Sequence, residues 1–308
     1  MRKVIIHSPY SESASQGNSV TATRMEGIFT EHGFKVAHSQ QEYSGEAADV
    51  MIALNARKSA KAIARFRYLH PASQIIIVLT GTDINHPDVI DKKSTTRISM
   101  RLADRLVVLH EASLKQVPEI FREKTSVVYP SVTIPSDVKH SADDDFTIIY
   151  AGNIRQEKNP ALLLAVAKKL PSAIQLELYG DAGDLRSSKL NFHGVVPHKE
   201  MLRAMSKAHV LLNTSFQEGG ANAICEAISM GLPVLATAIP GNIGMLGEDY
   251  AGLFPSDDLE ALVNLIEKAA NDSDFYALLK KQVAARAPLF AHERESASWL
   301  DLLNDLSN

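Results

Sequence analysis

The chain has 308 residues, 45% of them hydrophobic and 22% charged, a composition typical of a soluble globular protein with two ordinary domains or one large one. Its net charge of -4 argues against non-specific nucleic-acid binding as the main function. The sequence has neither 18 consecutive apolar residues nor the apolar region of a signal peptide, so we expect no membrane span. The single cysteine, Cys225, excludes a disulfide within the chain and fits the reducing cytoplasm.

The first half of the chain alternates short apolar runs with helical patterns. The predicted strands are Lys3–Ser8, Phe34–Ser39, Asp49–Leu54, Gln74–Thr80, Arg105–Leu109 and Ser126–Tyr129. The predicted helices are Gly17–His32, Ala56–Leu69, Asp91–Ala103 and Glu111–Glu123. The run Gln74–Thr80 is apolar on both faces, as a central strand covered by helices must be. This alternation predicts an α/β domain with a doubly wound parallel sheet.

The pattern breaks between Pro130 and Asp145. This stretch is rich in aspartate, serine and threonine, holds two prolines and has little apolar content, which is typical of a linker. We therefore predict a first domain over residues 1–134, a linker over 135–145 and a second domain over 146–288. The final helix, within residues 289–308, is expected to pack back on the first domain.

The second half repeats the alternation. Its predicted strands are Phe146–Ala151, Ile174–Tyr179, Asn191–Val196, Val210–Asn213, Pro233–Ala236 and Ala251–Phe254. Its predicted helices are Pro160–Leu170, Lys199–Ala208, Ala223–Met230, Leu259–Ala270, Phe275–Ala287 and Ala291–Leu306. The glycine-punctuated segment Pro240–Gly247 is predicted to be a loop. The chain should therefore fold into two domains of the same α/β type.

Several common site motifs are missing from both halves. No GxGxxG supports a dinucleotide site, and no GxxxxGK[ST] supports a P-loop. No histidines and cysteines stand at zinc-site spacing, so we expect no metal.

One stretch of the second half, residues 216–226, reads as a strand end, a glycine turn and a helix start. Gly219 and Gly220 let the backbone approach a ligand, and the following helix N-terminus suits a phosphate. Glu218 and Glu226 flank this anion site. A carboxylate repels phosphate but accepts hydrogen bonds from hydroxyls, so the stretch suits a ligand with hydroxyls on both sides of a phosphate, such as a nucleotide sugar. The alternative is a buried turn with two solvent-facing glutamates.

Two cations follow the first strand of the second domain. In open α/β sheets, ligands lie outside the carboxyl ends of the strands, where Arg155 and Lys158 are placed. Arginine binds a diphosphate through its fork and lysine as a point charge. The alternative is that both are ordinary surface cations.

These residues carry a family resemblance. The run from Gly152 to Glu157 and Lys158, together with Glu218 and Glu226 at E-x7-E spacing, resembles the glycosyltransferase group 1 superfamily of GT-B fold. The resemblance implies that cations hold the donor diphosphate, that the first glutamate contacts the sugar and that the second contacts the ribose. The donor-binding residues implied here are Gly152, Asn153, Arg155, Lys158, Val195, Glu218, Gly219, Gly220, Ala221, Asn222, Glu226 and Asn242. Asn153 departs from the arginine that usually follows the glycine.

A closer resemblance extends over nearly the full chain. Its motifs are Gly17-Asn18, residues 53–60, residues 79–83, residues 218–222, residues 241–247 and residues 287–290. They look like the selenosugar synthases of selenoneine biosynthesis. This resemblance implies transfer of the sugar of UDP-GlcNAc or UDP-glucose to selenophosphate, with a carbon–selenium bond formed and UDP released. Asn55 departs from the histidine usual in that family.

The strand ends of the first domain then supply the acceptor site. The candidate acceptor-binding residues are Gly17, Asn18, Asn55, Arg57, Lys58, Thr80, Gly81, Thr82 and Asp83. Arg57 and Lys58 are predicted to begin a helix, where a cation opposes the dipole unless an anion lies nearby. An anionic acceptor would supply that reason, and a solvated helix start is the alternative. A hydroxyl acceptor would need a base, for which Asp83 is the candidate.

The expected mechanism is displacement at the anomeric carbon of the sugar. Arg155, Lys158 and the helix start would stabilise the UDP leaving group, with Glu218 as the further catalytic candidate. Closure of the two domains over an interdomain cleft would exclude water. The expected partners are small-molecule substrates, without a metal or cofactor, and the sequence specifies no oligomeric state. A transferase with a hydroxyl acceptor and a non-catalytic nucleotide-sugar sensor remain the rival functions.

Overall fold

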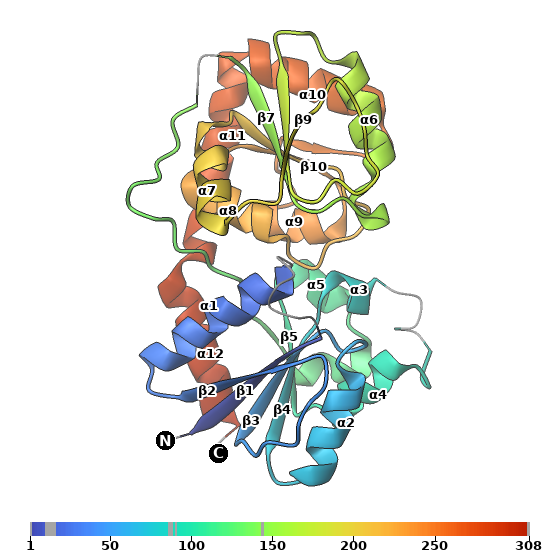
Figure 1. Ribbon diagram of the computed structural model, residues 1–308, viewed down its shortest axis with the longest axis vertical. Coiled ribbons are helices and arrows are strands. Elements are labelled where there is room, and N and C mark those ends of the chain that lie inside the picture. Colours follow the sequence, from blue (N-terminus) through green and yellow to red (C-terminus); the bar gives the residue numbers. More distant parts are fainter. Residues whose placement is uncertain (1, 10–16, 86–88, 90, 143–144, 307–308) are drawn as a thin grey trace. The chain divides into compact units, whose positions relative to one another are not determined.

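The computed structural model describes residues 2–9, 17–85, 89, 91–142 and 145–306 (Figure 1). The chain divides into two compact units. Unit 1 holds the residues up to Ser131 and those from His292 on, and unit 2 holds Val132–Ala291. Each unit contains one six-stranded sheet in which all strand pairs are parallel. The predicted fold class, two α/β domains with parallel sheets, is confirmed.

The sheet of unit 1 has the strand order β2-β1-β3-β4-β5-β6. Its strands are β1 Lys3–Ser8, β2 Lys35–Gln40, β3 Val50–Leu54, β4 Gln74–Val78, β5 Arg105–Val108 and β6 Thr125–Val127. Its helices are α1 Gly17–Glu31, α2 Ala60–Leu69, α3 Gly81–Ile84, α4 Thr95–Leu102, α5 Glu111–Gln116, the 3-10 helix η2 Glu119–Lys124 and α12 His292–Asp305. The crossover between β1 and β3 puts their carboxyl ends beside each other, and loops at that edge carry the acceptor candidates.

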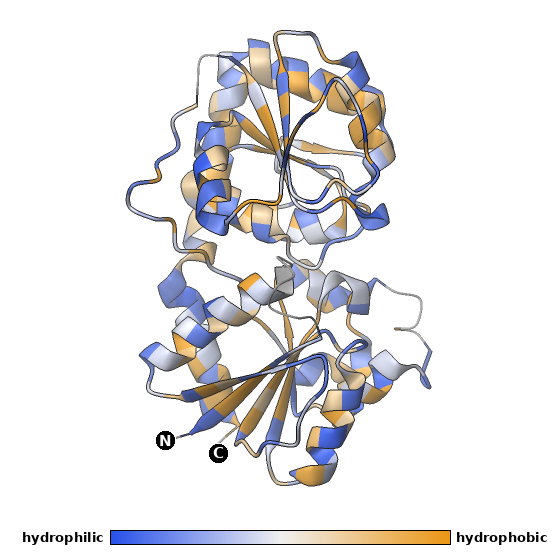
Figure 2. Ribbon diagram, in the orientation of Figure 1, coloured by the Kyte–Doolittle hydropathy of each residue, from blue (hydrophilic) through white to orange (hydrophobic). Residues whose placement is uncertain are grey.

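Helices cover both faces of this sheet. Strands β3 and β4 are buried along nearly their whole length, which matches their continuous apolar sequence and their orange colour in Figure 2. One face packs against apolar side chains of α1 and α12, including Phe29 and Trp299, whose rings meet edge to face at 5.7 Å. The other face packs against α2 and α4 through residues such as Phe66 and Met100. Unit 1 therefore has its own hydrophobic core on each side of the sheet.

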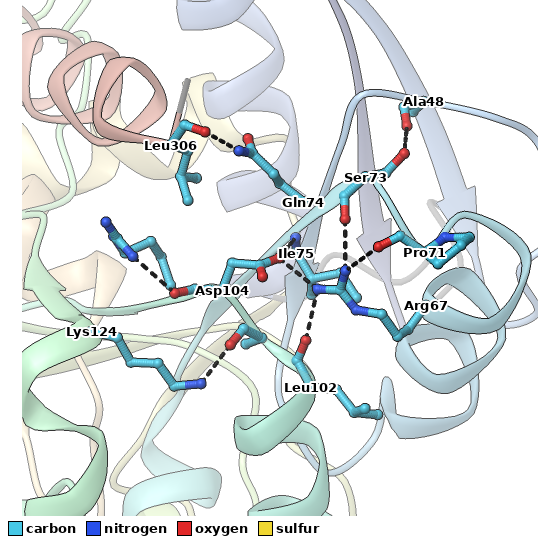
Figure 3. A network of polar contacts seen from close by, with 12 residues as sticks. Ala48, Arg67, Pro71, Ser73, Gln74, Ile75, Leu102, Asp104, Lys124 and Leu306 are labelled. Carbon is cyan, nitrogen blue, oxygen red and sulfur yellow. Dashed lines mark hydrogen bonds and ion pairs between the residues drawn. The ribbon is translucent and has the colours of Figure 1, made fainter. Parts of the chain in front are cut away.

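At the amino-terminal edge of this sheet, Arg67 joins two helices to two strands (Figure 3). Its guanidinium donates to the carbonyls of Pro71, Ser73 and Leu102, and to Asp104 Oδ2 at 2.6 Å. The same carboxylate oxygen accepts from the backbone N–H of Ile75 at 2.7 Å. This network holds the ends of α2 and α4 against the starts of β4 and β5.

We expect Arg67→Met to lower the free energy of unfolding of unit 1 by about 2–3 kcal/mol, because it removes the ion pair with Asp104 and the donor to three carbonyls. Urea unfolding followed by fluorescence of Trp299, the single tryptophan, measures this. Arg65→Met is the matched control, since Arg65 is exposed on the same helix and donates only to Ser44 O at 3.3 Å. Equal stability of the two variants would contradict the prediction.

The sheet of unit 2 has the strand order β12-β11-β10-β7-β8-β9. Its strands are β7 Thr147–Ala151, β8 Gln175–Tyr179, β9 Asn191–Gly194, β10 Val210–Asn213, β11 Val234–Thr237 and β12 Leu253–Phe254. Its helices are η3 Gln156–Lys158, α6 Pro160–Lys169, α7 His198–Lys207, α8 Asn222–Met230, α9 Pro240–Leu246, α10 Leu259–Asn271, α11 Ser273–Arg286 and η4 Ala287–Phe290. The switch in strand order lies between β7 and β10, the place where doubly wound sheets bind ligands.

The structure moves the bounds of several predicted elements, and the helix predicted over Asp91–Ala103 begins only at Thr95. The segment predicted as a loop after β11 is the helix α9. Pro240 stands at its start, where proline is tolerated, and Gly241 fits a closely packed site. The predicted helix Ala56–Leu69 begins only at Ala60, after a turn over residues 56–59. The predicted helix Glu111–Glu123 is interrupted before Glu119, because Pro118 has no N–H to continue it.

The segment predicted as the linker, residues 135–145, is counted with unit 2, and α12 is counted with unit 1. Cys225 is buried in α8. Within the described part of the chain, no helix is both long enough and apolar enough to span a bilayer.

Candidate functional site

The donor candidates of unit 2 gather at the carboxyl edge of its sheet. Lys158 follows β7, Val195 follows β9, Glu218 follows β10 and Asn242 follows β11. Because these strands are parallel, their carboxyl ends meet at one edge.

The strongest feature of this edge is an ion pair between Lys158 and Glu218. Lys158 Nζ lies 2.5 Å from Glu218 Oε1, and the side chains are 27% and 12% exposed. The same carboxylate accepts from Ser215 Oγ at 2.7 Å and from Asn213 Nδ2 at 3.3 Å. Burial opposes ionisation, but the Lys158 charge and these hydrogen bonds hold the pKa of Glu218 below its usual range. Glu218 is therefore ionised at neutral pH, and two of the three Lys158 N–H donors are left for an anion.

The loop that carries Lys158 is fixed to the loop after β10. Thr214 Oγ1 donates to Lys158 O at 2.7 Å, and the N–H of Phe216 donates to Glu157 O at 2.8 Å. Asn159 closes η3 in a left-handed conformation, with φ of 50°, and its side chain caps α6. These contacts explain how residues 60 positions apart, Lys158 and Glu218, keep one geometry.

The glycine turn leads into α8 as the sequence predicts. Gly220 has φ of 140°, a backbone conformation that favours glycine. Helix α8 begins after Ala221, which offers no side-chain cap, and has no acidic residue in its first turn. Such a helix start suits a phosphate, because its first N–H groups and its dipole both attract an anion.

The second glutamate, Glu226, is paired with a histidine. His198 Nε2 donates to Glu226 Oε1 at 2.7 Å, from the first position of α7. The Glu226 side chain is 8% exposed and that of His198 is 43% exposed. The hydrogen bond to Glu226 raises the pKa of His198 above 6.5. Burial lowers this pKa, and the negative charge of Glu226 raises it further.

A layer of buried polar residues lies below Glu218, and two of its members, Asn213 and Thr237, were missed by the sequence analysis. Asn242 is fully buried, and its Nδ2 donates to Thr237 O at 3.0 Å, to Thr237 Oγ1 at 3.1 Å and to Asn213 Oδ1 at 3.3 Å. Tyr150 is buried beside this layer, and burial, followed by the Glu218 charge, raises the pKa of its hydroxyl. The side chain of Asn242, a donor-binding candidate, therefore lies inside unit 2. The only sign of this layer in the sequence was the presence of polar residues within apolar segments.

Two glycines make this packing possible. A Cβ at Gly241 would lie 2.3 Å from Glu218 O and 2.7 Å from Glu218 Cβ. A Cβ at Gly180, where φ is 131°, would lie 2.4 Å from Gly152 O. Both glycines therefore let a site loop approach the backbone of its neighbour.

We expect Gly241→Ala to lower the free energy of unfolding by about 1–3 kcal/mol, because the added methyl group would displace Glu218. Urea unfolding followed by circular dichroism measures this. Gly27→Ala is the control, since a Cβ at Gly27 meets no atom within 4 Å and should stabilise helix α1 by about 0.5–1 kcal/mol. The close packing would be contradicted if Gly241→Ala were as stable as the wild type.

The other donor candidates lie on the surface of unit 2. Arg155 is exposed, and its side chain makes no hydrogen bond or ion pair with another described residue, although its carbonyl accepts from the Lys158 N–H at 3.0 Å. Asn153, in place of the usual arginine, accepts from the Asp181 N–H at 2.8 Å. Val195 is 57% exposed. The structure thus brings Glu218 to Lys158 and leaves Arg155 accessible.

In unit 1, one hydrogen-bond network joins the acceptor candidates after β3 and β4. Asn55, at φ of 71°, donates from Nδ2 to Thr80 Oγ1 at 2.8 Å and to Thr82 Oγ1 at 2.9 Å. Asn55 Oδ1 accepts from the Lys58 N–H at 2.8 Å. Gly81 and Thr82 stand in the first turn of the short helix α3, beside this network.

Asp83 supports this network from below. It is fully buried, and its carboxylate accepts from the backbone N–H groups of Thr80 at 2.9 Å and Arg57 at 3.1 Å. Burial raises its pKa, although these hydrogen bonds favour the ionised form. A base must reach the proton that it removes, and Asp83 has no surface exposure. The structure therefore does not place Asp83 where the predicted base role requires it.

Arg57 and Lys58 lie in the turn before α2 and not in its first helical turn, which corrects their predicted place. Lys58 is exposed, and Arg57 is partly buried with an Nε that has no partner among the described residues. Gly17 and Asn18 begin α1, and their side-chain surroundings lie outside the described structure.

No three carboxylate, imidazole or thiol side chains of the described ranges come together in the way that a metal site needs. The expectation of a reaction without a metal stays a prediction.

Solved structures share this architecture. Sucrose-phosphate synthase from Thermosynechococcus elongatus matches with a TM-score of 0.80 and 16% identity over 99% of both chains. Anabaena HepE, solved with UDP and glucose, matches with a TM-score of 0.78 and 15% identity over 99% of this chain and all of its own. At these identities the likeness shows the fold alone, and it is that of the two-domain GT-B proteins.

Relatives by sequence share a part of the chain. The sulfoquinovosyl transferase SQD2 of Arabidopsis thaliana is 29% identical over 163 residues, which are 49% of this chain and 30% of that protein. The glycosyltransferase 1 domain-containing protein 1 of Xenopus tropicalis is 28% identical over 101 residues, 33% of this chain and 28% of that protein. The chain thus spans less than a third of the length of these relatives. The family model of glycosyl transferases group 1 matches residues 132–286, half of the chain, and the chain belongs to that family.

Proposed function

We propose that the protein transfers the sugar of a UDP-sugar to an anionic acceptor, selenophosphate, and releases UDP. The observation that carries the donor half is the Lys158–Glu218 pair beside the start of α8. It places a cation and a helix N-terminus for the diphosphate next to an ionised carboxylate for sugar hydroxyls. Arg155, exposed on the same loop, adds a second cation. In unit 2 this combination supports a nucleotide-sugar donor.

The comparisons support the same donor class. The fold is shared with HepE, whose structures hold UDP with glucose and UDP-glucose. Two partial relatives are named as transferases of sulfoquinovose and of N-acetylglucosamine.

The acceptor half rests on unit 1 and on the resemblance to selenosugar synthases. The turn at Arg57 and Lys58 follows a strand end and is held by Asn55 and Asp83. An anion there would meet the exposed Lys58 side chain, next to the partly buried Arg57. Selenium would attack the anomeric carbon as the bond to the UDP oxygen breaks, with the electron pair leaving on UDP. The new bond joins carbon to selenium.

An acceptor that is already anionic needs no strong base, whereas a hydroxyl acceptor does. The burial of Asp83, and the backbone N–H groups that occupy its oxygens, support the anionic acceptor over the hydroxyl one.

The test is an acceptor screen with UDP release as the readout. Purified protein is mixed with UDP-GlcNAc or UDP-glucose and with selenophosphate, thiophosphate, phosphate or a sugar alcohol. The proposal expects UDP release with selenophosphate, and a product that contains the sugar and selenium. UDP release with the alcohol alone would overturn the proposal that selenophosphate is the acceptor. Binding of the UDP-sugar without turnover would favour a non-catalytic nucleotide-sugar sensor.

A further inference from the structure

We propose that His198 positions Glu226 for the ribose hydroxyls of the nucleotide, and that the preference for ribose over a sugar lacking these hydroxyls falls as the pH rises. The inference rests on the proposed function, because it needs a nucleotide at this edge of unit 2. His198 is a positioning residue here, since it acts through the carboxylate of Glu226.

The two carboxylate oxygens of Glu226 differ in their hydrogen bonds. Oε1 accepts from His198 Nε2 at 2.7 Å, whereas Oε2 has no hydrogen bond to another described residue. Glu226 lies one turn inside α8, the helix whose start suits the phosphate, and it is the only charged residue of that helix. A carboxylate held through one oxygen presents the other in a fixed direction, which suits a hydroxyl donor.

The imidazole of His198 is much more exposed than the carboxylate of Glu226. The Glu226 side chain is 8% exposed, and the His198 side chain is 43% exposed. An ionised carboxylate at this depth needs a donor, because burial without a partner disfavours the charge. His198 can be replaced with little effect on packing, so a variant there tests orientation more than folding.

Among the charged groups near His198, Glu226 has the largest effect on the pKa of its imidazole. Helix α7 packs against α8 and β7, and these contribute Glu226 and the buried hydroxyl of Tyr150. The other charged residues of α7 are Lys199, Glu200, Arg203 and Lys207. Lys199 and Arg203 face Asp137, at 3.5 Å and 2.7 Å.

The sign of the pH effect follows from this pair. The pKa of His198 is raised above 6.5 by its hydrogen bond to Glu226, so the charged pair is complete below pH 6.5. As the pH rises through the raised pKa, the imidazolium loses its proton and the charge-assisted bond weakens. At alkaline pH the hydrogen bond therefore orients Glu226 less firmly, and the preference for ribose falls.

The experiment compares the affinities of UDP and 2′,3′-dideoxy-UDP by titration calorimetry. Their ratio isolates the ribose hydroxyls, because both ligands carry the same base and the same titrating phosphates. We expect His198→Ala to reduce this ratio about tenfold, and we expect the wild-type ratio to fall with rising pH while that of His198→Gln stays flat. In Glu226→Gln the ratio should fall as well, and adding His198→Ala to it should cause little further loss.

His292→Gln is the matched control. It breaks a histidine–glutamate pair of similar length in unit 1, where His292 Nε2 lies 2.8 Å from Glu31 Oε2, and it should leave the ratio unchanged. A clear wild-type preference for UDP that persists in His198→Ala at every pH overturns the inference and leaves the proposed function intact. If the wild type binds neither ligand, the proposed function fails and the inference fails with it.

Discussion

Lys158→Ala is expected to lower kcat for transfer from a UDP-sugar by about 100–1,000-fold, the effect of losing one preorganised donor at a developing anion. In the proposed reaction the donor diphosphate gains charge as the sugar leaves, and Lys158 is the cation that forms an ion pair with Glu218. Steady-state UDP release, with UDP binding measured separately, checks the prediction. The loss should appear mainly in kcat, because the stabilised charge develops in the transition state.

The substitution also removes the partner of a nearly buried carboxylate. Lys158 holds the pKa of Glu218 down against burial, so its loss favours the protonated form of Glu218. The stability that Glu218 contributes is present above its unfolded-state pKa of about 4.5 and is lost as the pH falls through its lowered folded pKa. In Lys158→Ala this contribution should be missing at neutral pH as well.

Two variants separate these effects. Lys158→Arg keeps the charge and should retain more activity than the alanine variant. Lys169→Ala breaks an exposed lysine–glutamate pair in the same unit, with side chains 44% and 71% exposed, and should change neither activity nor stability measurably. A Lys158→Ala enzyme with kcat within a few-fold of the wild type would rule out the assigned role.

The ends of the strands could be predicted from the sequence because apolar runs and glycines depend on local structure. The continuous apolar run of β4 and the cap at Gly231, with φ of 76°, are set by residues next to one another in the chain. The glycine turn before α8 belongs to the same class. For that reason the strand ends, and the candidates on them, could be predicted.

Contacts between distant segments could not be predicted in this way. Lys158 and Glu218 were both candidates, but their direct pairing depends on how the loops after β7 and β10 are fixed to each other. The burial of Asp83 and Asn242 has the same cause, since short polar residues at strand ends look alike whether they face solvent or the interior.

Helix α9 shows the limit of local composition. Its glycines suggested a loop, because glycine is a poor helix former. At Gly241, however, the backbone of Glu218 leaves no room for a Cβ. Tertiary packing selects glycine there, and a single sequence does not distinguish that reason from flexibility.

A buried ion pair fixes α12 in unit 1. Glu295 of α12 is 2% exposed, and its Oε2 lies 2.9 Å from Arg24 Nε, whose side chain is 14% exposed. The same oxygen accepts from the N–H and the Oγ of Ser131, at 2.7 Å and 2.6 Å. Glu295 therefore ties the last helix to α1 and to the segment that follows β6.

Glu295→Ala is expected to lower the free energy of unfolding of unit 1 by about 3–5 kcal/mol, because it leaves Arg24 and the Ser131 N–H without an acceptor in a nearly buried place. Urea unfolding followed by Trp299 fluorescence measures it, since Trp299 lies one turn along the same helix. Glu293→Ala is the matched control: Glu293 is exposed in the same first turn, so its loss removes only the helix-dipole term of about 0.5 kcal/mol. Equal losses in the two variants would mean that the dipole, and not the buried pair, accounts for the effect of Glu295.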